Sequence, residues 1–148
     1  MNYLLHPLAR FCVALIFIIS GAGKIFGFAQ TAAMMGKLGF PMPDFFLTGA
    51  IALEIIGGLM LLFGYKTKIA ALLLIIFMIP ATLIFHTANL GDPAQTQLQM
   101  IQTLKNLAII GALIKFFADG AGAFSLDNFF TQSPAQSKAS SDVQLREA

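Results

Sequence analysis

Residues 45–63 have the sequence FFLTGAIALEIIGGLMLLF, in which Thr48 and Glu54 are the polar side chains. A helix needs about 20 mostly apolar residues, and at least about 17, to cross the hydrocarbon core of a bilayer. A strand of the same composition would leave backbone N–H and C=O groups without partners in lipid. This stretch therefore predicts a membrane-spanning α-helix.

Three further stretches have the same character. Residues 8–26, 69–85 and 101–118 are apolar apart from a few interruptions. The sequence thus predicts an all-α integral membrane four-helix bundle in residues 1–130. Residues 131–148 are rich in Ser, Ala, Gln and charge, and we expect them to form a disordered polar tail. The connection from Gln30 to Asp44 contains glycines and prolines, and its Phe40-Pro41-Met42-Pro43 stretch favours an extended or turned backbone.

The first stretch has a rival interpretation. A basic start, an apolar run and the small residues Ser20-Gly21-Ala22 resemble a secretory signal peptide with its cleavage site. Arg10 lies late for such a peptide, and cleavage would leave three spans. We favour an uncleaved first helix.

Composition agrees with the membrane assignment and excludes other classes. Charged residues make up 11% of the chain and apolar residues 57%, whereas a soluble domain carries roughly 25% charged residues. A net charge of +2 without a Lys/Arg run argues against nucleic acid as a partner. Cys12 is the single cysteine, so the chain has no dithiol pair.

The distribution of basic residues predicts the orientation. With four spans both termini lie on one side, together with Arg10, Lys66, Lys68 and Lys115. The opposite side holds Lys37, besides Lys24 and Lys105, which lie within span ends. By the positive-inside rule we expect a multi-pass inner-membrane protein with both termini in the cytoplasm, and Arg10 and Lys115 as anchors at that membrane face.

Five polar side chains within or at the ends of the spans predict a functional site. Intramembrane ionisable residues are costly and usually face a bundle interior or cavity. Alternating helix directions bring Lys24, His86, Lys105 and Asn106 to one membrane face, with Glu54 deeper. We therefore expect a polar pocket, with Glu54 and His86 as catalytic candidates. In that pocket Lys24, Lys105 and Asn106 are the candidates for substrate binding.

Each of these residues also has a structural interpretation. Glu54 can serve as a clamp between helices, and Lys24 and Lys105 can extend to headgroups. His86 stands where interfacial polar residues are common, without ligand-type neighbours at metal-binding spacing, so we expect no metal site. Small residues at Gly57 and Gly58 predict close helix approach, as do Gly23 and Gly27 in the first span.

The chain resembles the DoxX family of small four-helix membrane proteins. The resemblance rests on the order and spacing of several segments between Leu8 and Asp127. They are Ser20-Gly21-x-x-Lys24, Gly39-Phe40-Pro41, Glu54-x-x-Gly57-Gly58, Leu62-x-Gly64, Ala81-Thr82, Phe85-His86, Lys105-Asn106-Leu107-Ala108 with Gly111, Gly120-x-Gly122 and Ser125-Leu126-Asp127.

The resemblance implies a function in membrane redox chemistry. Some relatives are similar to the small subunit of a thiosulfate:quinone oxidoreductase. In that interpretation Lys24 and Lys105 hold an anionic substrate or a quinone oxygen, and Glu54 or His86 relays a proton. The chain has no intrinsic cofactor ligands, so it would use quinone directly or act with partner subunits or as a homo-oligomer. A non-enzymatic membrane scaffold or assembly factor is one alternative and a small transporter or channel that forms by oligomerisation is another, and the sequence leaves open whether the protein is an enzyme.

Overall fold

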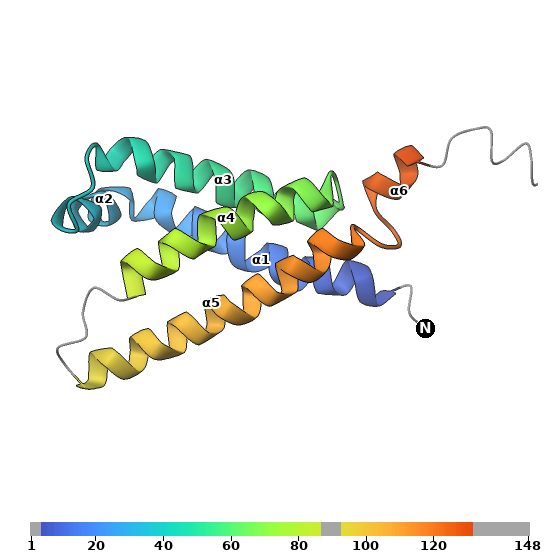
Figure 1. Cartoon of the computed structure of the whole chain (residues 1–148). Helices are drawn as coiled ribbons and strands as arrows, with labels where there is room; N and C mark the ends of the chain where they lie inside the picture. Colours follow the sequence, from blue (N-terminus) through green and yellow to red (C-terminus); the bar gives the residue numbers. More distant parts are fainter. Residues whose placement is uncertain (1–3, 87–92, 132–148) are drawn as a thin grey trace, which may run out of the picture.

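The computed structural model describes residues 4–86 and 93–131. This part of the chain forms six helices: α1 (Leu5–Phe26), α2 (Phe28–Lys37), α3 (Pro43–Phe63), α4 (Thr67–His86), α5 (Pro93–Asp119) and α6 (Leu126–Thr131) (Figure 1). By length and composition α1, α3, α4 and α5 can each cross a membrane. The predicted all-α membrane fold is confirmed. The predicted tail (131–148) lies outside the described residues, except for Thr131 at the end of α6.

The predicted spans correspond to these four helices with different boundaries. α1, α3 and α4 begin two or three residues earlier than residues 8, 45 and 69. α5 begins at Pro93, eight residues before the predicted start at residue 101. At 1.5 Å per residue its 27 residues extend about 40 Å, which exceeds a hydrocarbon core of about 30 Å. The polar first turns of α5 can therefore be helical and still lie outside the hydrocarbon core.

The long helices pack in the order α1, α3, α4, α5. α1 lies along α3, α3 contacts α4, and α4 lies along α5. One apolar core joins all four helices, and its buried members are Ala14, Phe17, Leu61, Ala70, Ala71, Leu74, Met78, Ile109, Leu113 and Phe116. In Figure 1, α5 crosses α1 near the start of α1 and runs away from it toward its own N-terminus.

Glycines on α3 allow the close approach of α1 and α4. A Cβ at Gly57 would lie 3.0 Å from Leu74 of α4, and one at Gly58 would lie 2.9 Å from Ile18 and 3.3 Å from the carbonyl oxygen of Ala14. The prediction for Gly57 and Gly58 is confirmed. Gly23 has no such neighbour within 4 Å, so its predicted packing role is wrong.

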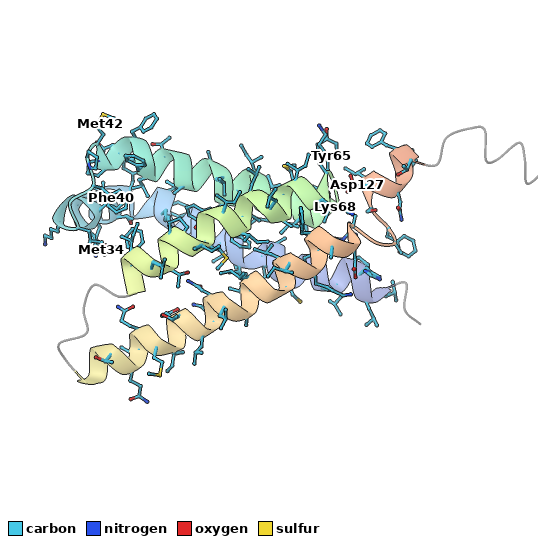
Figure 2. The ribbon with its side chains drawn as sticks, in the orientation of Figure 1. Met34, Phe40, Met42, Tyr65, Lys68 and Asp127 are labelled. Atoms are coloured by element: carbon cyan, nitrogen blue, oxygen red, sulfur yellow. The ribbon has the colours of Figure 1, made fainter. Side chains whose placement is uncertain are left out.

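The connection between the first two spans contains a helix, α2, which was not predicted from the sequence. Its buried residues Ala32 and Met35 pack with Leu47 of α3 in a second, smaller core, which Phe40 and Phe85 also contact. Phe40 stacks on Phe85 with ring centroids 6.1 Å apart. Figure 2 shows Met34, Phe40 and Met42 together at this end of the molecule, which we call the α2 end.

The opposite end is closed by polar contacts, and we call it the clamp end. Asp127 accepts hydrogen bonds from the backbone N–H groups of Lys66 (2.6 Å) and Thr67 (2.9 Å), where α4 begins. The backbone N–H of Asp127 donates in turn to the carbonyl oxygen of Gly64 at 2.9 Å. Asp127 therefore caps α4 and ties the segment after α5 to the α3–α4 turn (Figure 2).

Arg10 completes the clamp end from α1. Its Nη2 donates to the carbonyl oxygens of Phe124 at 2.6 Å and Ala123 at 3.4 Å. The side chain is 1% exposed. The expectation that Arg10 is an interfacial anchor is therefore wrong, because its charge is directed at backbone carbonyls inside the protein. Lys115 is exposed and pairs with Asp119, and its predicted role as an anchor at the membrane face stays a prediction.

Candidate functional site

An ion pair between α1 and α3 forms the centre of the candidate site. Nζ of Lys24 lies 2.9 Å from both carboxylate oxygens of Glu54. It also donates to the hydroxyl oxygen of Ser20 at 2.7 Å, and that hydroxyl lies 3.4 Å from Oε1 of Glu54. The pair is asymmetric in exposure: the side chain of Glu54 is 6% exposed and that of Lys24 28%.

The local sequence accounts for this geometry. Ser20 and Lys24 are four residues apart, so one helix face presents both. Gly21 lies between them, and a Cβ there would lie 2.7 Å from Ile55 and 3.4 Å from Cβ of Glu54. The missing side chain lets α1 approach α3 closely enough for a short, two-oxygen contact.

The ion pair lies deep in the span. Glu54 is nine residues from Phe63, the end of α3, which is about 14 Å at 1.5 Å per residue. A hydrocarbon core is about 30 Å thick. The carboxylate is thus near the middle of the span, and the long side chain of Lys24 reaches it from the α2 end.

A second polar contact joins α4 to α5. Nδ2 of Asn106 donates to Oγ1 of Thr82 at 3.0 Å, and Thr82 donates to the carbonyl oxygen of Met78 at 2.7 Å. Hydrogen bonds of this kind hold membrane helices together without an ionised group. Asn106 is therefore engaged by α4.

The structure thus brings together part of the predicted pocket. Lys24 and Glu54 meet as expected. Asn106 contacts Thr82, and no contact between it and the ion pair is present among the described residues. Lys105 is exposed on α5. The side chain of His86 lies outside the described residues, so its predicted role stays a prediction.

Ser20 and Thr82 are site residues that the predicted set lacked. Both are the hydrogen-bonding partners of predicted residues. The signal was present in the sequence, because Ser20 and Lys24 have helical i,i+4 spacing. Thr82 has the same spacing from His86, but in the structure its hydroxyl accepts a hydrogen bond from Asn106 on another helix. In the described ranges no group of three His, Cys, Asp or Glu side chains could hold a metal ion.

These features define a class of protein: a multi-pass membrane protein of four spanning helices with a charge pair near mid-membrane. The DoxX family model matches residues 6–87. "Inner membrane protein YqjF" of Escherichia coli (strain K12) is 34% identical over 84% of this chain and 90% of its own length. "Inner membrane protein YphA" of the same organism is 34% identical over 81% and 86%. The chain belongs to the DoxX family and is an inner-membrane protein.

A further relative carries a functional name. "Putative oxidoreductase CatD" of Bacillus subtilis (strain 168) is 29% identical over 71% of this chain and 78% of its own length. No solved structure matches the chain.

Proposed function

We propose that the protein is a quinone-linked component of a membrane oxidoreductase and that it acts with a partner subunit. The observation that supports this proposal is the Lys24–Glu54 pair, a fixed proton donor and acceptor near mid-membrane with one edge of the lysine exposed. A lipid-soluble quinone can reach such an edge from the bilayer. The name of the Bacillus relative points to the same class of reaction.

The hydrogen bonds of Lys24 indicate how a quinone would bind. An ammonium group has three N–H donors, and here they have three acceptors: the two oxygens of Glu54 and the hydroxyl of Ser20. A quinone carbonyl oxygen would replace the neutral Ser20 hydroxyl, since that bond is weaker than the bonds to the carboxylate. Glu54 would keep the ammonium oriented during the exchange.

The proposed reaction requires two electrons and two protons for each quinone reduced to quinol. The electrons come from a reduced redox centre of the partner subunit, which is oxidised in the same step. Lys24 donates a proton to the developing oxyanion and becomes a neutral amine, and the Glu54 carboxylate then takes up a proton from water and passes it to this amine. His86 stays a candidate for the second proton.

The alternative function is a non-enzymatic membrane scaffold or assembly factor. The saturation of Lys24 is the specific observation that favours it, because every N–H of the ammonium already has an acceptor. A pair of this kind can serve as a structural clamp between α1 and α3. Removing it would then lower the amount of folded protein and leave no separate effect on bound quinone.

We further propose that the clamp end faces the cytoplasm. Lys66, Lys68 and Lys115 are exposed at that end, and the positive-inside rule places such residues on the cytoplasmic side. An alkaline phosphatase fusion to the C-terminus should be inactive, and a fluorescent-protein fusion should be bright. The reverse pattern would overturn this orientation.

Quinone analysis tests the redox proposal. The wild-type protein, purified gently from native membranes, should contain roughly stoichiometric quinone, and Glu54→Gln should lose it when quinone is measured per mole of folded protein. Asp119→Asn is the matched control, since it converts a carboxylate to an amide in an exposed Lys–Asp pair. Quinone at the level of bulk membrane in the wild type would contradict the proposal and favour the scaffold.

A further inference from the structure

The apolar side of α6 is turned away from the rest of the protein. Leu126, Phe129 and Phe130 lie within an arc of about 100° around this short helix, since each residue advances it by about 100°. Their side chains are 39%, 75% and 69% exposed. The rings of Phe129 and Phe130 meet edge to face with centroids 5.7 Å apart, so the two form one patch. We call these three residues the apolar face of α6.

The polar side of α6 is the side that is bonded to the clamp end. Asp127 accepts the hydrogen bonds of the Lys66 and Thr67 backbone N–H groups, and Nδ2 of Asn128 donates to the carbonyl oxygen of Gly122 at 2.8 Å. Asp127 and Asn128 lie about 110° and about 150° around the helix from the centre of the apolar face. A surface helix of a soluble protein turns its apolar side toward the core. In α6 this orientation is reversed, as is expected in apolar surroundings.

The depth of α6 follows from its contact with the end of α3. The backbone N–H of Asp127 donates to the carbonyl oxygen of Gly64, which directly follows Phe63, the last residue of α3. The 21 residues of α3 extend about 32 Å at 1.5 Å per residue, and a hydrocarbon core is about 30 Å thick. α6 is therefore attached where the hydrocarbon core meets the headgroups. Figure 1 shows it beyond the ends of α3 and α4.

The side chains around this attachment point are those of a headgroup region. Phe63 is 57% exposed at the end of its spanning helix. Lys66 and Lys68 are exposed directly after it in the chain. At a membrane interface, apolar side chains insert toward the acyl chains while ammonium groups stay with the headgroups. Exposed aromatic and basic residues at one level thus indicate the boundary of the bilayer.

We infer that α6 is an interfacial helix whose apolar face inserts among the lipid headgroups at the clamp end. Its partner is the surface of the bilayer. Asp127 and Asn128 hold the polar side of the helix to the protein, and the lipid covers the opposite side. The segment after α5 is thus held from both sides. This placement is independent of the proposed redox function, because it involves neither Lys24 nor Glu54.

Single tryptophan reporters test this placement, because the chain contains no tryptophan of its own. Full-length protein carrying Phe129→Trp or Phe130→Trp is reconstituted into vesicles whose phospholipids bear a nitroxide either near the headgroup or near the end of an acyl chain. Both reporters should lose more fluorescence to the shallow nitroxide than to the deep one. Iodide in the water should quench them only weakly.

Two further reporters serve as controls. Phe63→Trp, at the exposed end of a spanning helix, is the lipid-facing reference and should also be quenched by the shallow nitroxide. Thr131→Trp lies on the polar side of α6, about 150° from the centre of the apolar face. It should be quenched more strongly by iodide than Phe129→Trp and Phe130→Trp are.

Three results would overturn the inference. Iodide quenching of Phe129→Trp and Phe130→Trp as strong as that of Thr131→Trp would place the apolar face in water. Stronger quenching by the deep nitroxide than by the shallow one would place α6 inside the hydrocarbon core. Protection of both reporters from iodide and from both nitroxides would mean that polypeptide, such as a second copy of the chain, covers the face.

Discussion

Glu54→Gln, Lys24→Met and the double variant form a cycle that measures how strongly the intramembrane ion pair stabilises the fold. Nζ of Lys24 lies 2.9 Å from both oxygens of Glu54. Unit charges at about 4 Å attract by about 4 kcal/mol at an effective dielectric constant of 20, and desolvation offsets part of this energy. Removing one partner of a buried pair costs about 3–5 kcal/mol because the other charge is left uncompensated.

Each single substitution should lower the free energy of unfolding by about 3 kcal/mol. The lower end of the range applies because the Lys24 side chain is 28% exposed and can turn toward the headgroups. The double variant should lose about 3 kcal/mol and not the sum of the two single losses, because the second substitution removes the charge that the first one left without a partner. The coupling energy is therefore about 3 kcal/mol.

Equilibrium unfolding in mixed micelles with increasing SDS, followed by circular dichroism, measures these free energies. Additive losses, with the double variant about 6 kcal/mol below the wild type, would refute the reasoning. A strong coupling together with unchanged quinone content in Glu54→Gln would assign the pair to structure alone.

Three further substitutions test other contacts, each by the same unfolding measurement. Asp127→Ala removes the cap from the start of α4 and should cost about 1–2 kcal/mol; an unchanged stability would mean that the clamp end is held by other contacts. Gly57→Ala should cost about 1–3 kcal/mol because its Cβ would crowd Leu74. Gly49→Ala, whose Cβ meets open space, is the matched control and should not destabilise. Thr82→Val removes the acceptor of Asn106 and should cost about 0.6–1.7 kcal/mol; a gain in stability would contradict the importance of this bond.

Apolar runs predicted the membrane helices because backbone N–H and C=O groups in hydrocarbon must be paired with one another, as they are in an α-helix. The boundaries were less accurate where the chain leaves the lipid. α5 starts at Pro93 among Gln and Thr residues that precede the predicted span at residues 101–118. α2 was missed because glycines and prolines near it indicated a loop, although Phe28, Ala32 and Met35 have helical spacing and lie in the small core.

The candidate site was predictable as far as it depends on spacing along one helix. Ser20 and Lys24 are such a pair, and Glu54 was the one carboxylate deep in a span. What could not be predicted is which helices diverge. The divergence of α1 and α5 depends on the packing between them. Because of this divergence Lys105 is exposed, while Asn106 donates a hydrogen bond to Thr82. The burial of Arg10 likewise depends on carbonyl groups more than 110 residues away in the chain.

That separation has a consequence for the order of events during biosynthesis. Helices enter the membrane as they are synthesised, so α1 is in place long before Ala123 and Phe124 exist. Until then Arg10 lacks the carbonyl groups to which its Nη2 donates in the finished protein. Completion of the segment after α5 supplies these acceptors to Nη2, while Nε and Nη1 of Arg10 have no hydrogen-bond partner among the described residues. The contact of Arg10 with Ala123 and Phe124 therefore forms only in a chain that has been synthesised through the segment after α5.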